Sequence, residues 1–235
     1  MSWNSLLENA YVPYSEAAKA CIVESDKGNF FAGVRIENIS YPVTISSLQA
    51  ACSICLSEGE TPIRVFLPLQ IDADQLSYWK DEFDLEIIKT DEPPLDKLTS
   101  CFKEEPEDFS SQEELKNLIN RAVTPNSDFP VSAILFVEGG YFEGVNVEVS
   151  DWSMGLCAER VAIAKAKAAG ISKFKRMDVH TLKGEFSSPC GACRQVVTEM
   201  MPYHELSLYH ADGSLSKHLS ADLLPFSFKT SSLKK

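Results

Sequence analysis

The second half of the chain carries the clearer pattern of apolar and polar positions. Two apolar runs, Val131–Val137 and Tyr141–Val147, flank Glu138–Gly140, a pattern that predicts a β-hairpin. In Gly155–Ala169 the apolar residues recur at the spacing of a packed helix. The sequence therefore predicts a strand pair followed by a helix.

The elements after this helix continue the alternation. Met177–Leu182 and Glu205–Tyr209 are strand candidates, and Cys190–Met201 between them is a helix candidate. Strands that alternate with helices are typical of layered α/β domains. We expect that architecture for this half.

The same pattern occurs twice. Phe31–Asn38 reads F-A-G-V-R-I-E-N, and Phe142–Val149, 111 positions later, reads F-E-G-V-N-V-E-V. The same offset relates Gly59 to Gly170, and each glycine follows a helical stretch as a C-terminal cap would. We therefore expect two copies of one unit. Each copy should contain a helix, a strand pair, a helix, a strand, a helix, a strand and a short final helical segment.

An acidic stretch that contains a proline, Lys103–Ser111, separates the copies and reads as a linker. We predict a first domain at residues 1–103, a linker at 104–111 and a second domain at 112–235. The expected fold class is α/β. Each domain should have α/β/α layers, with a mixed sheet of about five strands and flanking helices.

Composition narrows the possible partners. The 22 Lys and Arg residues face 34 Asp and Glu residues, a net charge of -12 that repels phosphate backbones. We expect a small-molecule ligand and no nucleic-acid polymer.

The sequence also bears on the compartment. No apolar run is long enough for a membrane span, and the first residues do not resemble a secretion signal, so we expect a cytoplasmic protein. Seven irregularly spaced cysteines favour thiol or metal chemistry over disulfides.

Two motifs in the second copy carry candidate chemistry. Cys157-Ala158-Glu159-Arg160 begins one predicted helix, and Cys190 and Cys193 lie one turn apart at the start of another. Helix N-termini favour thiolates. Three thiolates occupy three of the four tetrahedral positions on zinc, which is the arrangement of a catalytic site. We expect one Zn²⁺ per chain at these cysteines.

Other charged residues in the motifs have separate expected roles. Glu159 lies roughly 200° around a helix from Cys157, so it is not expected to share the metal, although it can reach a water near it. Arg160 and Arg194 can offset the charge of the thiolates by hydrogen bonding to sulfur.

The motifs together resemble the cytidine deaminase family, in its zinc-dependent three-cysteine form. The resemblance rests on C-A-E-R and on P-C-G-A-C-R-Q, which starts at Pro189. It also includes F-P-V from Phe129, G-V-N-V-E from Gly144 and the closing L-L-P-F-S-F from Leu223. It spans nearly all of the second copy, from Glu113 to Phe228.

This resemblance implies a reaction and a role for each site residue. The reaction is hydrolytic deamination of cytidine or deoxycytidine to uridine or deoxyuridine and ammonia, a step of pyrimidine salvage. A zinc-bound water would be the nucleophile and Glu159 the proton shuttle. Asn146 and Glu148 would bind the ribose, Phe129 would stack on the pyrimidine, and backbone groups near Ala158 and at 188–190 would contact the base edge.

The first copy lacks these residues. Ser46-Ser47-Leu48-Gln49 stands in place of C-A-E-R, and residues 71–74 replace the P-C-x-x-C motif. Arg35 replaces the ribose-binding Asn, and Ala17 replaces the stacking Phe. We expect a structural role for this copy. Its Cys52 and Cys55 are expected in the core, and the tryptophans Trp3, Trp79 and Trp152 in packing.

Single-copy relatives form tetramers whose pockets are completed by aromatic residues from neighbouring subunits. The resemblance therefore implies a homodimer of this two-copy chain, with Phe102 or Phe228 reaching a pocket in another unit.

Alternative functions remain open on the sequence. One is deamination of another aminopyrimidine nucleoside, because the segment Val149-Ser150-Asp151-Trp152 and Ser132 depart from the family pattern. A second is a nucleoside-binding or assembly protein without turnover, in which the zinc would be purely structural.

Overall fold

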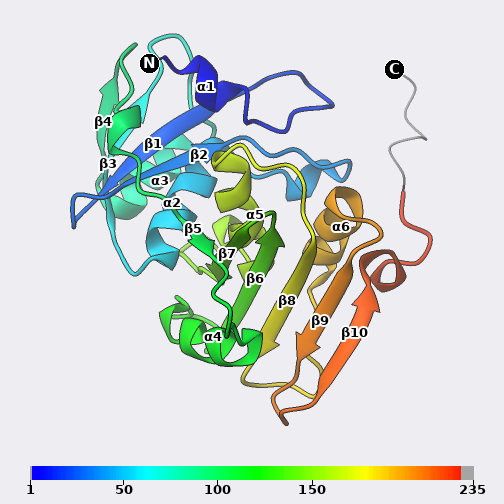
Figure 1. The fold of residues 1–235 in the computed structure, drawn as a ribbon. Coiled ribbons are helices and arrows are strands. Elements are labelled where there is room, and N and C mark those ends of the chain that lie inside the picture. Colours follow the sequence, from blue (N-terminus) through cyan, green and yellow to red (C-terminus); the bar gives the residue numbers. More distant parts are fainter. Residues whose placement is uncertain (1, 229–235) are drawn as a thin grey trace.

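The computed structural model describes residues 2–228, which form two β-sheets with helices around and between them (Figure 1). The elements of the first copy are α1 (Asn4–Leu7), β1 (Ala20–Ser25), β2 (Phe30–Val34), α2 (Ser47–Ser57), β3 (Pro62–Leu67), α3 (Leu76–Phe83) and β4 (Glu86–Lys89). Those that follow are β5 (Phe102–Glu104), α4 (Ser111–Leu118), β6 (Val131–Val137), β7 (Gly140–Val145), α5 (Ala158–Ala168), β8 (Arg176–Thr181), α6 (Gly191–Met200), β9 (Glu205–Tyr209) and β10 (Leu215–Leu219).

The two sheets share one topology. The first has the strand order β2-β1-β3-β4, and the second repeats it as β7-β6-β8-β9, with β5 and β10 added at its edges. In both, the first strand pairs antiparallel with the second and the third, and the third pairs parallel with the fourth. The internal repeat and the α/β class are thus confirmed, with four and six strands where about five each were expected.

Most predicted elements of the second copy are present with small shifts at their ends. Strands β6 and β9 have the predicted bounds. Helix α5 begins three residues later than predicted, because Leu156 still pairs with Val147 in a β-bridge and Cys157 is extended as the N-cap. Likewise, Cys190 is the N-cap of α6 and not its first helical residue.

The segment between the copies contributes to the second sheet. Phe102–Glu104 forms β5, which pairs antiparallel with β7, and helix α4 starts at Ser111. The chain therefore joins the second sheet at Phe102, at the end of the range predicted for the first domain.

A glycine in each copy lets a strand approach the central helix closely. A Cβ on Gly144 of β7 would overlap the backbone of Ala158 in α5, and a Cβ on Gly33 of β2 would overlap the backbone of Ser47 in α2. The repeated Gly-Val of the sequence thus marks the same packing in both copies.

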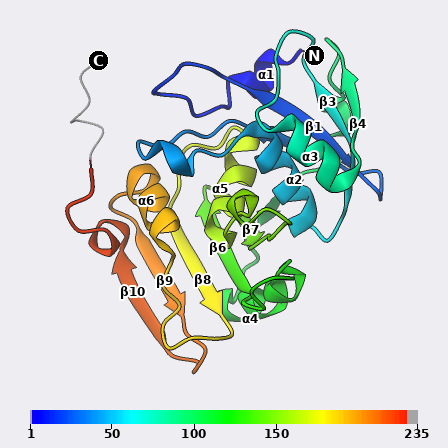
Figure 2. The same cartoon turned by 180° about the vertical axis from the view of Figure 1, so that it is seen from behind.

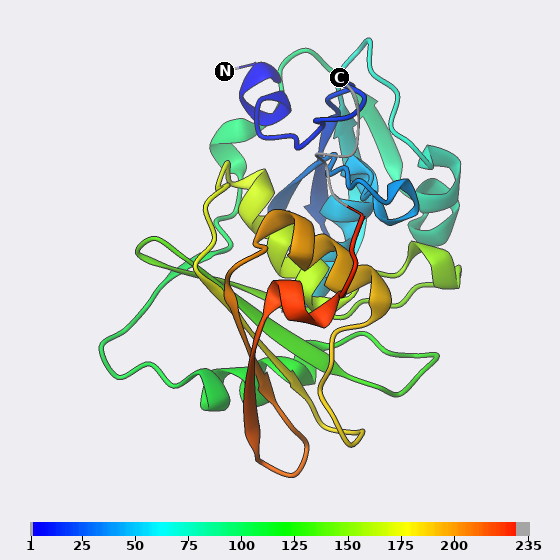
Figure 3. The same ribbon diagram turned by 90° about the vertical axis from the view of Figure 1, so that its right-hand side faces the viewer.

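The central helices also join the copies. Figure 3 shows helices between the two sheets, and α2 packs against α5 there. The apolar core of the first copy continues into the second through Val147, Leu156, Val161 and Ala164. Helix α4 covers the opposite face of the second sheet, with Leu115 and Leu118 packed on strand residues, which completes three layers.

Side chains expected in the core are mostly there. Cys52 and Cys55 are buried in α2, and Trp3 and Trp79 are buried. Trp152 does not pack in the core as expected: it is 68% exposed, on a short 3-10 helix (Trp152–Met154). None of the helices among residues 2–228 has the length and apolar character needed to cross a bilayer.

Candidate active site

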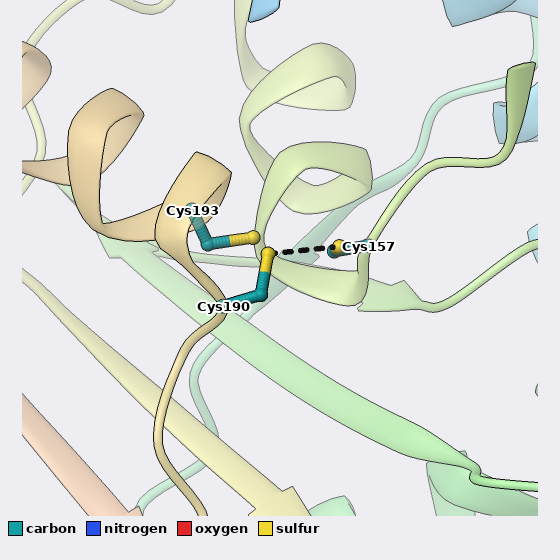
Figure 4. A group of neighbouring side chains, drawn as sticks. All are labelled: Cys157, Cys190 and Cys193. Atoms are coloured by element: carbon teal, nitrogen blue, oxygen red, sulfur yellow. Dashed lines mark hydrogen bonds between the residues drawn. The ribbon is translucent and has the colours of Figure 1, made fainter. Parts of the chain in front are cut away.

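Three cysteines that are distant in sequence meet between two helix N-termini. Cys157 caps α5, Cys190 caps α6, and Cys193 lies in the first turn of α6 (Figure 4). Their three Sγ atoms lie within 4.8 Å of one another, and those of Cys157 and Cys190 are 3.5 Å apart. The fold therefore assembles the predicted trio.

This trio suits Zn²⁺. Thiolate sulfurs at about 2.3 Å from a tetrahedral zinc stand roughly 3.8 Å from one another, close to the spacing here. Hydrogen bonds from the thiols of Cys157 and Cys193, with the Ala192 and Cys193 amides, hold the pKa of Cys190 far below its usual value. Among residues 2–228, no other group of three or more potential ligands gathers in this way, and this group has no fourth protein member. Three soft ligands without a fourth are typical of a catalytic zinc site.

Glu159 lies beside the trio in the first turn of α5. It is only 2% exposed, yet it lines the same pocket as Cys157 and Cys190. Burial raises the pKa of the Glu159 carboxyl to about 7. A group with such a pKa can both accept and donate a proton near neutral pH.

The pocket in front of the cysteines has a volume of about 530 Å³. Its walls include the predicted site residues Phe129, Asn146, Glu148 and Arg160. Ala158, between Cys157 and Glu159 in the sequence, is fully buried and does not line the pocket. The fold thus gathers two of the three predicted metal ligands, the acid-base group and the predicted substrate-binding side chains around one cavity, with Cys193 buried next to the other two cysteines.

A hydrogen-bond network presents Phe129 to this pocket. The Glu148 carboxylate accepts from the amides of Asn126 and Ser127, at 2.9 and 3.0 Å, and from the Ser127 hydroxyl, which in turn accepts from the Phe129 amide. Asn146 binds the same segment, donating to the Phe129 carbonyl at 3.0 Å and accepting from the Val131 amide at 2.8 Å. The Phe129 ring remains 38% exposed.

The two motif arginines bind oxygen atoms in this structure. Arg160 donates to the carbonyl of Val43 in the first copy at 2.9 Å. Arg194 donates to the Pro189 carbonyl at 2.8 Å and to the Ser188 hydroxyl at 2.6 Å, which braces the segment before Cys190. Their hydrogen bonds to sulfur stay a prediction.

Neither candidate aromatic from another unit lines the pocket of its own chain. Phe102 packs on Phe142, with ring centroids 5.7 Å apart, and Phe228 is 58% exposed. Their contact with a pocket in another unit stays a prediction.

In the first copy, an ionic network occupies the equivalent place. Ser46 caps α2 where Cys157 caps α5. Arg35 pairs with Asp74 at 2.7 Å, and Lys19 pairs with the same carboxylate. Glu37 still accepts from the backbone amides of Tyr14 and Ser15, as Glu148 does in the second copy. The framework of the site persists in the first copy while its ligands are absent.

Trp152 and Thr181 also line the pocket, and sequence reasoning did not assign them to the site. The sequence could have indicated Trp152, because it lies six residues after Asn146, in a segment that departs from the family pattern. For Thr181, at the end of β8, the sequence had no such indication.

Comparisons with known proteins agree with the geometry. Two models, each described as the cytidine and deoxycytidylate deaminase zinc-binding region, match residues 107–205 and 5–68. A cytidine deaminase of Sporosarcina psychrophila is 39% identical over 125 residues, which cover 51% of this chain and 90% of that protein. A probable cytidine deaminase of Dictyostelium discoideum is 38% identical over 132 residues, with 52% and 89% covered. A solved cytidine deaminase of Burkholderia pseudomallei is 35% identical, with a TM-score of 0.48, and the match covers 51% of this chain and all of that one.

Proposed function

The chain belongs to the cytidine deaminase family, and on this premise we propose that its second copy deaminates cytidine or deoxycytidine hydrolytically. The products are uridine or deoxyuridine and ammonia. One observation carries the proposal: two of three clustered thiols and a buried carboxyl line one pocket together with a partly exposed aromatic ring. A purely structural zinc needs neither the carboxyl nor the pocket.

Cys157, Cys190 and Cys193 hold the zinc in this proposal. When bound, zinc acts as a Lewis acid that turns water into a nucleophile at neutral pH. The amides of Ala192 and Cys193 at the start of α6 add to the thiol hydrogen bonds that favour the thiolate of Cys190.

Glu159 moves the protons. Its carboxylate accepts a proton from the water that attacks C4 of the pyrimidine and delivers it to ring N3. Glu159 then takes the remaining proton from the hydroxyl added at C4 and passes it to the exocyclic amine, so that C4=O forms as the C4–N bond breaks and the amine leaves as ammonia. The burial of Glu159 keeps bulk water from competing for these protons.

The remaining pocket residues orient the nucleoside. Phe129 stacks on the base, while Asn146 and Glu148 bind the ribose from the segment directly after β7. Because both also bind the backbone around Phe129, a ribose contact and the position of the stacking ring are linked. Backbone groups near Ala158 and at residues 188–190 contact the base edge.

The proposal is tested with purified, zinc-loaded protein. Incubation with cytidine should release ammonia and shift the absorbance spectrum to that of uridine. Ammonia from another aminopyrimidine nucleoside alone would favour that substrate class. Binding of cytidine without any ammonia release would overturn the proposed activity and favour a binding protein.

Phe129→Ala should weaken substrate binding while leaving the metal in place. Loss of base–aromatic stacking costs ~1–3 kcal/mol, which raises KM by roughly 5- to 150-fold. Steady-state kinetics measures this, and Tyr203→Ala, which removes an exposed ring outside the pocket, is the control. An unchanged KM in Phe129→Ala would contradict the stacking role.

We also propose a homodimer with four family-type units and two zinc ions. Closed two-fold symmetry would give it the same four-unit body that single-copy relatives build from four chains. Light scattering should give twice the mass of one chain. A fully active species with the mass of one chain would contradict the dimer, and with it the roles of Phe102 and Phe228.

A reducing, cytoplasmic setting fits this function. All seven cysteines are free thiols in the structure, which is typical of proteins in that compartment.

A further inference from the structure

Helix α6 carries two of the three zinc-binding cysteines at its start and a bound glutamate near its end. The carboxylate of Glu199 accepts three hydrogen bonds from the first copy. The donors are the Tyr14 hydroxyl at 2.8 Å, the Tyr11 hydroxyl at 3.1 Å and the Ile39 amide at 2.8 Å. We call this group the Glu199 latch.

The first copy holds α5 at its C-terminal end as well. The Asn9 side chain donates to the carbonyl of Ala168 at 3.0 Å, and Glu58 pairs with the buried Lys165. Both helices that bring cysteines to the zinc site are therefore fixed to the first copy at the ends remote from the metal.

A matched contact exists on the other side of the repeat. Glu82 of α3, the first-copy counterpart of α6, accepts from the amide of Ser150 at 2.9 Å and from its hydroxyl. Ser150 lies 111 positions after Ile39, so the two glutamates bind the same backbone position in opposite copies.

The tyrosines make the two contacts different. The equivalents of Tyr11 and Tyr14 in the second copy are Val123 and Asn126, as their matching backbone contacts to strand ends and to Glu37 or Glu148 indicate. Where hydroxyls bind Glu199, the second copy has a cavity of about 180 Å³ next to Glu82. Two tyrosine hydroxyls thus bind the glutamate of the helix that carries the cysteines, whereas Glu82 accepts from one serine hydroxyl and Tyr78 of α3 accepts from the Asp151 amide at 3.2 Å. Helix α3 has no cysteine.

Hydrogen bonds to a carboxylate are stronger than those between neutral groups. Burial, followed by the nearby Glu199 carboxylate, raises the pKa of Tyr11 well above its usual value, so its hydroxyl stays a donor. Phenylalanine has no hydroxyl to donate, and glutamine replaces one of the two acceptor oxygens with an NH2 donor, so it cannot accept both from the tyrosine hydroxyls at Oε1 and from the Ile39 amide at Oε2.

We propose that Glu199 is a positioning residue, through which the first copy sets α6 so that Cys190 and Cys193 face Cys157 before zinc binds. The proposal rests on the zinc site of the proposed function. It gives the first copy a role in metal retention beyond covering an apolar face.

The test compares zinc release from Glu199→Gln and from the Tyr11→Phe/Tyr14→Phe double variant with that of the wild-type chain. Loss of groups that orient metal ligands typically costs ~10- to 100-fold in metal affinity, and we expect zinc transfer to a colorimetric chelator to accelerate by a similar factor. In the cobalt-substituted protein, the thiolate-to-metal absorption should change. Tyr14→Phe alone is the milder variant if the others fold poorly.

Glu82→Gln is the matched control. It removes the equivalent carboxylate from α3, and should lower Tm without faster zinc release. Release unchanged in the Glu199 and tyrosine variants would overturn the proposal, as would equal acceleration in Glu82→Gln. A wild-type chain that binds no zinc at all would instead overturn the proposed function.

Discussion

Glu159→Gln should lose nearly all turnover while keeping its zinc. The amide has almost the same shape and can hydrogen bond to the attacking water, but it cannot accept the proton and pass it on. Removal of a general acid-base group typically costs ~10²- to 10⁴-fold, and we expect at least that loss in kcat. Cytidine-dependent ammonia release, with metal analysis of the same sample, measures both properties.

Glu138→Gln is the control for this variant, because Glu138 is an exposed carboxylate in the β6–β7 turn, remote from the pocket. It should retain normal kcat. Near-normal activity of Glu159→Gln would show that another residue moves the proton. A loss of zinc from it would show that Glu159 is a metal ligand.

Cys190→Ser should lose both zinc and activity. A serine hydroxyl does not ionise near neutral pH and is a harder, weaker ligand for zinc than a thiolate. The two remaining thiols cannot hold the metal tightly, so zinc content should fall from about one per chain toward zero. Elemental analysis after dialysis and an activity assay provide the readouts.

Cys101→Ser is the appropriate comparison, since Cys101 is a half-buried thiol outside the zinc-binding trio. It should keep its zinc. Full zinc retention by Cys190→Ser would contradict the ligand assignment, and two zinc ions per wild-type chain would contradict a single site in the second copy.

Local patterns predicted much of this fold. The hairpin formed by β6 and β7 follows from two apolar runs around a glycine turn, and β9 follows from its own short run. The start of α5 was predicted too early, because apolar periodicity cannot distinguish Leu156 in a β-bridge from Leu156 in a helix. The cysteine trio was predictable because each ligand lies at a helix start with its own local motif.

Contacts between the two copies could not be predicted from local sequence patterns. Arg160 donates to Val43, and Glu199 accepts from Tyr11, pairs that lie more than a hundred residues apart in sequence. No spacing rule relates such residues, because their proximity depends on how two finished domains pack. Strand β5 was missed for a similar reason, since its pairing with β7 needs the second sheet to be in place.

The close approach of strand and helix at Gly33 has a consequence for how such a chain can diverge. The first copy has exchanged every metal ligand, yet an added methyl group at Gly33 would still collide with the backbone of α2. A duplicated domain that no longer catalyses a reaction must therefore still keep the glycine that lets its strand pack against its central helix. In other chains that contain two such domains, a glycine packed against the first turn of the central helix should therefore identify a copy without metal ligands more dependably than any cysteine.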